Sequence, residues 1–320
     1  MDFGITALPD PPASRFVEVV QHAERAGFHY AYTYDSHLLW QAGEAFLAAA
    51  AAATHRIRLG YCVTNPGTRE PTVTASFHAT LHSMSGGRAV CLIGRGDSAR
   101  RTIGYQPVKM AEFEAACVMM KGLMNGEAVE WNGKHLRLGG DNPIESNLWQ
   151  QALAGLPELE LWVAGYGPKA LAVAGRVATG VVIQLADPEI VQWLMGIARR
   201  AAEEAGRDPD LLKPIVCAPA VITDDLEEGR SLTRWFPAMV SNHVADLLGR
   251  YDRATLPAAL VDYLDRREFY NYKDHSRVGA AHGEFVDDET CDRFSVIGPV
   301  ERHVERMREL AAIGVAQYNI

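Results

Sequence analysis

RIRLGYCVTNPGTREPTVTASFHATLHSMSGGRAVCLIGRGDS, residues 56–98, carries the signals of a strand, a turn, a helix, a strand and a turn in that order. Apolar residues that alternate with small or polar ones predict a strand over residues 57–63. Residues 64–67, TNPG, end it, because proline lacks the amide hydrogen that a ladder needs. Apolar residues at helical spacing predict a helix over residues 72–84. The continuous apolar run at residues 89–93 is typical of a parallel strand covered on both faces.

Strand patterns recur about every 30 residues with helix patterns between them, which indicates the βα repeat of a parallel sheet. Eight such strands predict an α/β fold, a (β/α)8 TIM barrel with insertions. The alternative is a doubly wound open sheet, but the loop after the first strand is proline-rich and has no G-x-G-x-x-G. We therefore favour the barrel, with strands over residues 3–8, 29–34, 57–63, 89–93, 159–164, 180–185, 215–222 and 315–319.

Two segments interrupt the repeat. We expect one domain over residues 1–320, with insertions at approximately 126–157 and 226–293. The first insertion contains a predicted hairpin that turns at Asn132-Gly133. The second insertion is helical, aromatic and charged, and is much longer than one return helix requires.

Composition excludes several classes of protein. The chain of 320 residues has 31 Lys and Arg against 40 Asp and Glu, a net charge of −9, which disfavours a nucleic-acid partner. The start has no signal-peptide pattern and no apolar run is long enough to span a membrane. The 5 scattered cysteines predict buried, reduced thiols in a cytoplasmic protein. His78 and His82 have the i, i+4 spacing of metal ligands but lack a third ligand nearby, so we predict no metal site.

Barrel enzymes carry their sites on the loops that follow the strands. His37 follows the second strand, and a histidine can exchange a proton near neutral pH; the alternative is a structural histidine. Trp40, close behind it, is predicted either to line the substrate pocket or to pack. The turn GYGPK, residues 165–169, is the predicted phosphate site, because its glycines let the backbone approach and a helix begins at Pro168.

The stretch at residues 56–98 resembles the bacterial luciferase-like superfamily. The similarity is greatest to its F420-dependent oxidoreductase branch, which includes methylenetetrahydromethanopterin reductase. The matching residues are Val63, Thr64, Asn65, Pro66, Arg69, Pro71, Thr74, Ala75, Ser76, Thr80, Leu81, Ser85, Gly87, Arg88, Gly94, Gly96 and Asp97.

The resemblance implies a non-prolyl cis peptide at Cys62-Val63 that supports the ring of the cofactor. It also implies that His37 lies by that ring as the acid or base. Relatives have S-D-H where this chain has D-S-H, so Asp35, the second candidate catalytic residue, is displaced by one position. Asp97 is expected to accept hydrogen bonds from the polar chain of the cofactor, and the alternative is a helix cap. The expected cofactor-binding residues are Cys62, Val63, Thr64, Asn65, Gly94, Gly96, Asp97, Gly165, Tyr166, Gly167, Pro168, Lys169 and Gln184.

The second insertion is predicted to form a lid over the substrate. Clustered aromatic residues and histidines favour this role, and the alternative is a contact between subunits, since the resemblance also implies a homodimer or higher homo-oligomer. The expected substrate-binding residues are Trp40, Tyr272, His275 and His282.

Three functions stay open on the sequence. The first is an oxidoreductase that transfers a hydride between coenzyme F420 and a small organic substrate; Arg95, Arg100, Arg101 and Lys169 are candidate cations for the anionic tail of F420. The alternative is a two-component monooxygenase that uses reduced FMN and O2 and needs a flavin reductase as partner. The third is a non-enzymatic protein that binds a flavin or deazaflavin.

Overall fold

Strands and helices alternate along the chain in the computed structural model, which describes residues 1–320 except 245–246, 250, 268 and 272–276. The chain divides into two compact units. The first unit comprises Phe3–Val163 and Val177–Thr179. The second comprises Met1–Asp2, Ala164–Arg176 and Gly180–Ile320.

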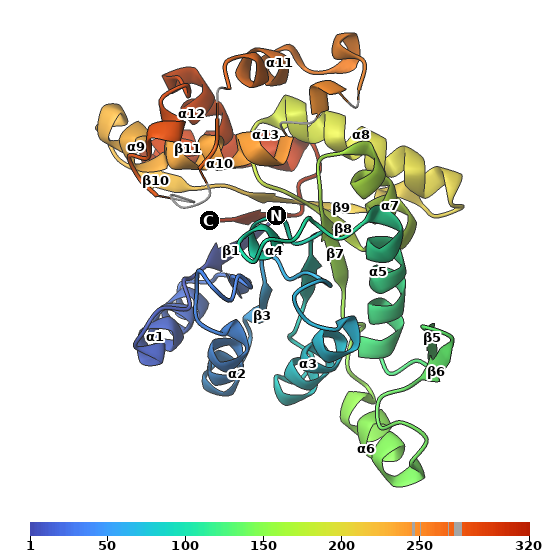
Figure 1. Ribbon diagram of the computed structural model, residues 1–320. Coiled ribbons are helices and arrows are strands. Elements are labelled where there is room, and N and C mark those ends of the chain that lie inside the picture. Colours follow the sequence, from blue (N-terminus) through green and yellow to red (C-terminus); the bar gives the residue numbers. More distant parts are fainter. Residues whose placement is uncertain (245–246, 250, 268, 272–276) are drawn as a thin grey trace. The chain divides into compact units, whose positions relative to one another are not determined.

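Parallel strands with helices between them build the first unit (Figure 1). Strand β1 pairs with β2, β2 with β3, and β4 with β7, and an isolated parallel bridge joins Leu59 to Ala89. The elements that begin in this unit or lead into it are β1 (Asp2–Thr6), α1 (Ala13–Arg25), β2 (Tyr30–Thr33), α2 (Gly43–Ala53), β3 (Arg58–Tyr61), α3 (Pro71–Met84), β4 (Cys91–Ile93), α4 (Asp97–Arg101), α5 (Met110–Met124), β5 (Val129–Trp131), β6 (Lys134–Leu136), α6 (Pro143–Leu153) and β7 (Leu161–Ala164).

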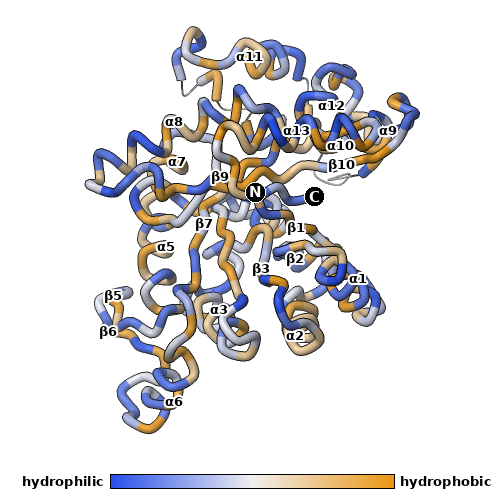
Figure 2. Tube along the Cα trace, turned by 180° about the vertical axis from the view of Figure 1, so that it is seen from behind, coloured by the Kyte–Doolittle hydropathy of each residue, from blue (hydrophilic) through white to orange (hydrophobic). Residues whose placement is uncertain are grey.

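Buried strands form the core of this unit. Every residue of β2 and β4 is buried, as expected of parallel strands with both faces covered. Helix α1 covers the strands with the apolar stripe Phe16, Val20 and Ala23, and Figure 2 shows how hydrophilic and hydrophobic residues mix along it. Burial of a side chain as large as Phe16 or Val20 stabilises the fold by about 1.5–3 kcal/mol. All 5 cysteines are free and buried, as the sequence predicts.

The first insertion contains the predicted hairpin. Strands β5 and β6 pair antiparallel, and Asn132 and Gly133 both have positive φ, 49° and 72°, as a tight hairpin turn requires. The helix α6 was not expected in this segment. Asn142 caps it by accepting a hydrogen bond from the Ile144 amide at 3.0 Å, and Pro143 occupies its first turn. These are ordinary start signals of a helix.

Three further parallel strands lie in the second unit, in which β8 pairs with β9 and β9 with β12. A small separate sheet pairs β10 with β11. The elements are α7 (Pro168–Val177), β8 (Gly180–Ile183), α8 (Pro188–Glu204), η1 (Pro209–Leu211), β9 (Lys213–Cys217), β10 (Ala220–Ile222), α9 (Leu226–Thr233), α10 (Trp235–Val244), η2 (Leu247–Gly249), η3 (Arg253–Thr255), α11 (Ala258–Asp265), η5 (Ala281–Gly283), α12 (Asp288–Phe294), β11 (Val296–Gly298), α13 (Val300–Ala312) and β12 (Gln317–Asn319).

The seventh predicted strand, residues 215–222, is divided in the structure. Its first part belongs to β9 and its second part is β10, which pairs with β11 in the small sheet. Pro219 stands between them, and the Val296 amide donates to its carbonyl at 3.0 Å. A proline cannot donate to a ladder, so the prediction of one continuous strand was wrong at this residue.

Ion pairs hold the helices of the second insertion together. Arg230 of α9 pairs with Asp292 at 2.6 Å and with Asp288 at 3.3 Å, both on α12. Arg234 pairs with Asp288 at 2.6 Å. These contacts fix α9 against α12 within the unit.

The strands and helices give the predicted class, a (β/α)8 barrel with insertions. The division into a single domain with two insertions stays a prediction. In the part of the chain that the structure describes, no helix combines the length and apolar character that crossing a bilayer requires.

Candidate functional site

The end of β2 carries a buried carboxylate, Asp35, which is 6% exposed. Arg69 donates to both of its oxygens, at 3.0 Å from Nη1 to Oδ1 and 2.5 Å from Nη2 to Oδ2. Thr64 Oγ1 donates to Oδ2 at 2.6 Å. Arg69 Nη1 also lies 2.6 Å from Glu44 Oε1 at the start of α2. This network connects the loops that follow β2 and β3, and the sequence did not assign a role to Arg69 or Glu44.

His37 lies two residues beyond Asp35 and its side chain is exposed. The Leu39 and Trp40 amides both donate to the Ser36 carbonyl at 2.9 Å, so the chain turns tightly around His37. Trp40 stacks on Tyr34, with ring centroids 5.9 Å apart and an angle of 27° between the planes. The loop after β2 thus presents an imidazole to solvent beside a stacked aromatic pair.

The loop after β3 contains the expected cis peptide, Cys62-Val63. Thr64 is fully buried, and its amide donates to the Leu92 carbonyl at 2.8 Å. Asn65 Oδ1 accepts from the amides of Gly67 and Thr68, both at 3.0 Å. This side-chain turn shapes the loop that leads to Arg69.

The loop after β4 packs against the loop after β3. The Gly94 amide donates to the Thr64 carbonyl at 2.9 Å. Gly96 has a φ of 78°, and a Cβ placed there would lie 2.9 Å from Asn65 Oδ1, so both the backbone and the space require glycine. Asp97 begins α4 and pairs with Arg101 at 2.6 Å.

Two of the candidate cations for the anionic tail make structural contacts. Arg100 donates to the Gly67 carbonyl, and Arg95 Nε donates to the Val108 carbonyl at 2.7 Å.

Consecutive strand ends of the first unit carry ten of the predicted site residues: Asp35, His37, Trp40, Cys62, Val63, Thr64, Asn65, Gly94, Gly96 and Asp97.

The second unit carries the predicted phosphate turn, residues 165–169. Helix α7 begins at Pro168, and Lys169 is exposed at its first turn. The Gln184 amide, at the end of β8, donates to the Tyr166 hydroxyl at 2.8 Å. Two predicted cofactor residues from different strand ends therefore meet in this unit.

The second insertion contacts this turn, which the sequence did not indicate. His243 of α10 stacks on the Tyr166 ring at 6.2 Å with an angle of 22°. The Tyr251 hydroxyl donates to the Tyr166 carbonyl at 3.4 Å. Both residues lie far from Tyr166 in sequence and in a segment without a βα repeat, so no pattern pointed to them.

The predicted lid residues have different outcomes. Tyr272 and His275 lie outside the described residues. His282 is 2% exposed and contacts Tyr270 in a tilted arrangement, with ring centroids 4.4 Å apart and an angle of 55° between the planes. It borders a hollow of about 230 Å³ that Arg234 and Trp235 also line.

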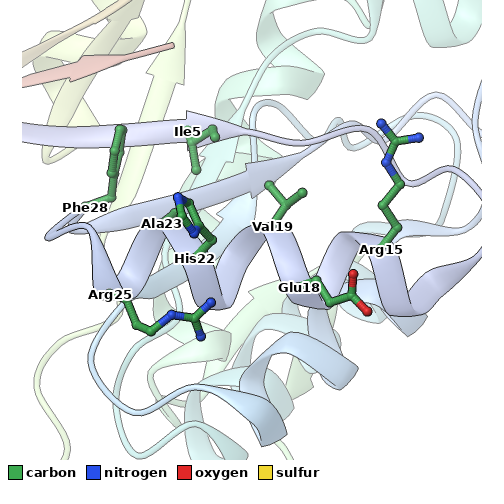
Figure 3. Close-up of a pocket in the computed structure, with 8 residues that line it drawn as sticks. All are labelled: Ile5, Arg15, Glu18, Val19, His22, Ala23, Arg25 and Phe28. Atoms are coloured by element: carbon green, nitrogen blue, oxygen red, sulfur yellow. The ribbon is translucent and has the colours of Figure 1, made fainter.

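A wider hollow of about 580 Å³ lies along α1 and is bordered by Ile5 of β1 (Figure 3). None of the predicted site residues lines this hollow. Its lining mixes apolar and charged side chains, which are Ile5, Arg15, Glu18, Val19, His22, Ala23, Arg25 and Phe28. Among the described residues, no group of His, Cys, Asp or Glu is arranged to hold a metal ion. His78 Nδ1 instead lies 2.8 Å from the Thr74 carbonyl, and His82 Nε2 lies 2.9 Å from the Pro157 carbonyl.

A parallel βα fold whose strand-end loops carry an exposed histidine and a glycine-rich turn at a helix start defines a barrel of the enzyme type. The model of the luciferase-like monooxygenase family matches residues 1–317, so the chain belongs to that family and is a luciferase-like oxidoreductase. A 5,10-methylenetetrahydromethanopterin reductase from Methanolobus tindarius is 29% identical over 325 residues, which cover 99% of this chain and 93% of the relative.

Two solved structures have the same fold over nearly the whole chain. One is a coenzyme F420 dependent tetrahydromethanopterin reductase from Methanopyrus kandleri, with a TM-score of 0.74 and 24% identity over 100% of this chain and 92% of the other. The other is an F420-dependent secondary alcohol dehydrogenase in complex with an F420-acetone adduct, with a TM-score of 0.73 and 21% identity over 99% and 93%.

Proposed function

We propose that this protein is an F420-dependent oxidoreductase that transfers a hydride between the deazaflavin and a small organic substrate. The observation that carries the proposal is the similarity, over nearly the full chain, to a family branch whose named members include F420-dependent enzymes. Bound F420 supplies the hydride chemistry, and the protein supplies binding, orientation and proton transfer.

The donor groups of the second unit fit a phosphorylated cofactor. A helix N-terminus offers free amides and positive potential, and α7 places it directly after Gly165 and Gly167. Lys169 adds a cation at the same helix end. We assign this turn to the cofactor phosphate, with Gln184 fixed beside it through Tyr166.

The groups of the first unit fit the reacting end of such a cofactor. The loops after β3 and β4 approach each other closely through a backbone contact, in which the Gly94 amide donates to the Thr64 carbonyl. His37 is exposed and able to exchange a proton with the substrate oxygen or nitrogen. Trp40, stacked on Tyr34, supplies an apolar wall.

Fluorescence titration of the purified protein with F420 and, separately, with FMN tests the proposal. Selective micromolar binding of F420, followed by turnover with alcohols, ketones or imines in the absence of oxygen, is the expected result. Selective binding of FMN would instead make the protein a monooxygenase that needs a flavin reductase. Tight binding without turnover of any substrate would favour the non-enzymatic function. The expected homodimer, the lid and the cytoplasmic location stay predictions.

A further inference from the structure

We propose that Arg69 is a positioning residue of the candidate site, which fixes the orientation of the Asp35 carboxylate and holds the His37 loop against the loop after β3. The inference rests on the proposed function, since it concerns the proton-transfer group of that site. It replaces the prediction that Asp35 itself acts as an acid or base.

Both carboxylate oxygens of Asp35 are bound. Its two oxygens accept three hydrogen bonds, two from the Arg69 guanidinium and one from the Thr64 hydroxyl. The Asp35 side chain is 4% exposed and Arg69 is 24% exposed. A bidentate pair of this kind fixes the orientation of the carboxylate as well as its charge.

Arg69 also serves a second carboxylate, Glu44, at 2.6 Å. Burial alone would lower the pKa of Arg69, but Asp35 and Glu44 together raise it above its usual value. One guanidinium therefore balances two carboxylates. Removing it would leave two like charges in a largely buried place, a situation that favours protonation of one of them.

The other titratable groups that face this network are neutral near pH 7. Burial raises the pKa of the Tyr61 hydroxyl, and the Asp35 charge raises it further. Burial likewise raises the pKa of the Cys91 thiol and lowers the pKa of His78 to about 4. Among the described residues, Arg69 is therefore the cation that pairs with both carboxylates.

The network explains how the position of His37 is determined. Asp35 precedes His37 by two residues, and the Ser36 carbonyl between them accepts the amides that close the loop. Thr64, which binds the same carboxylate, belongs to the loop after β3. Arg69 thus acts on His37 through Asp35, which ties two strand-end loops together.

Three variants and one control test this role: Arg69→Lys, Arg69→Met, the double variant Arg69→Met/Asp35→Asn, and Arg88→Met. Lysine keeps the charge but lacks the planar fork that reaches both carboxylates. Arg88 is the matched control, because it makes comparable hydrogen bonds to Ser85, Thr54, Ile57 and Ala51, none of them at the candidate site.

The steady-state readouts are kcat, KM and the pH profile of kcat/KM. We expect Arg69→Lys to lower kcat roughly 10-fold and Arg69→Met roughly 100-fold, with cofactor affinity changed less than about twofold. Arg69→Met should gain an ionisation in its pH profile, and the added Asp35→Asn change should remove it. Arg88→Met should lower the melting temperature and leave kcat and the profile unchanged. If Arg69→Met behaves as Arg88→Met does, the positioning role is refuted.

A readout without cofactor separates this inference from the proposed function. The ring Cε1–H resonance of His37, assigned with His37→Gln, should move in both Arg69 variants and stay in place in Arg88→Met. A resonance that moves in a protein that does not bind F420 would support the network and remove the F420 function. A resonance that stays fixed in an active enzyme would remove the network and leave the function.

Discussion

Asp35 and His37 are two residues apart and have opposite surroundings. Asp35 is buried and bound by Arg69 and Thr64, whereas the side chain of His37 is exposed. A group that exchanges protons with a substrate must be reachable from the site, and Asp35 is buried with both carboxylate oxygens bound. The proposed function therefore gives proton transfer to the histidine.

Replacement of His37 by alanine should therefore lower turnover by roughly 100-fold or more, since general acid–base groups contribute about that much. Cofactor affinity should change little, because the predicted binding residues are left intact. His22→Ala is the control, since His22 is an exposed histidine of α1 that is not among the predicted site residues. Stopped-flow reduction or oxidation of F420 measures both variants, and wild-type turnover in His37→Ala would make this histidine structural.

Gly167→Val tests the phosphate turn. A branched side chain directly before Pro168 would keep an anion away from the amides of α7, so we expect the dissociation constant for F420 to rise at least about 10-fold. Gly196→Val is the control, because Gly196 lies within α8. Equal affinity of both variants and the wild type would remove the turn from the cofactor site.

At the scale of elements, local sequence signals predicted the turns and helices whose formation depends on interactions between neighbouring residues. The hairpin turn at Asn132-Gly133 needs two residues with positive φ, and the sequence contains the pair that adopts them most readily. Helix α3 (Pro71–Met84) agrees with the helix predicted over residues 72–84. The strand break at Pro219 and the Asn142-Pro143 start of α6 were missed, although both signals are local, since proline and an amide cap act on their own neighbours.

The contacts that define the candidate site depend on residues distant in sequence. Arg69 reaches Asp35 across 34 residues, and His243 meets Tyr166 across an insertion without a repeat. Hydrophobic periodicity does not reveal such a pair. The local pattern around each partner permits several residue types at that position, so it does not identify the distant residue that the side chain contacts. The fold class and the loops that carry the site were therefore predictable, and the network behind His37 was not.

Helix α3 should make the stability of the protein depend on pH. Burial lowers the pKa of His78 to about 4, against 6.5 for an exposed histidine. Between these values the unfolded chain binds a proton that the folded chain does not. The contribution of His78 to the free energy of unfolding should thus have its full value above pH 6.5. The free energy should fall as the pH drops towards 4, by up to about 3 kcal/mol.

The variant His78→Gln should flatten this dependence, because glutamine does not titrate and still donates to the Thr74 carbonyl that His78 contacts. His55→Gln, at an exposed histidine, should leave it unchanged. Urea unfolding at pH 7.5, 6 and 5 gives the three free energies. Parallel curves for wild type and His78→Gln would show that the pKa of His78 is the same in the folded and the unfolded protein.

At the scale of the whole molecule, binding of the proposed cofactor should stabilise the folded chain. A ligand that binds only the folded protein at 100 times its dissociation constant raises the free energy of unfolding by about 2.7 kcal/mol. Such a gain corresponds to a rise in melting temperature of roughly 5 °C.

We therefore expect F420 to raise the melting temperature of the wild type, and substitution of a predicted cofactor-binding residue to reduce that rise. Asp97→Ala tests the loop after β4, with the exposed Asp10→Ala as control, and Gly167→Val tests the turn at residues 165–169, with Gly196→Val as control. Calorimetry with and without F420, and again with FMN, measures all five proteins. A shift lost only in Gly167→Val would confine the cofactor to the turn, because a ligand that does not touch Asp97 cannot lose binding energy there. A shift produced by FMN and not by F420 would keep the same residues and change the reaction from hydride transfer to oxygenation.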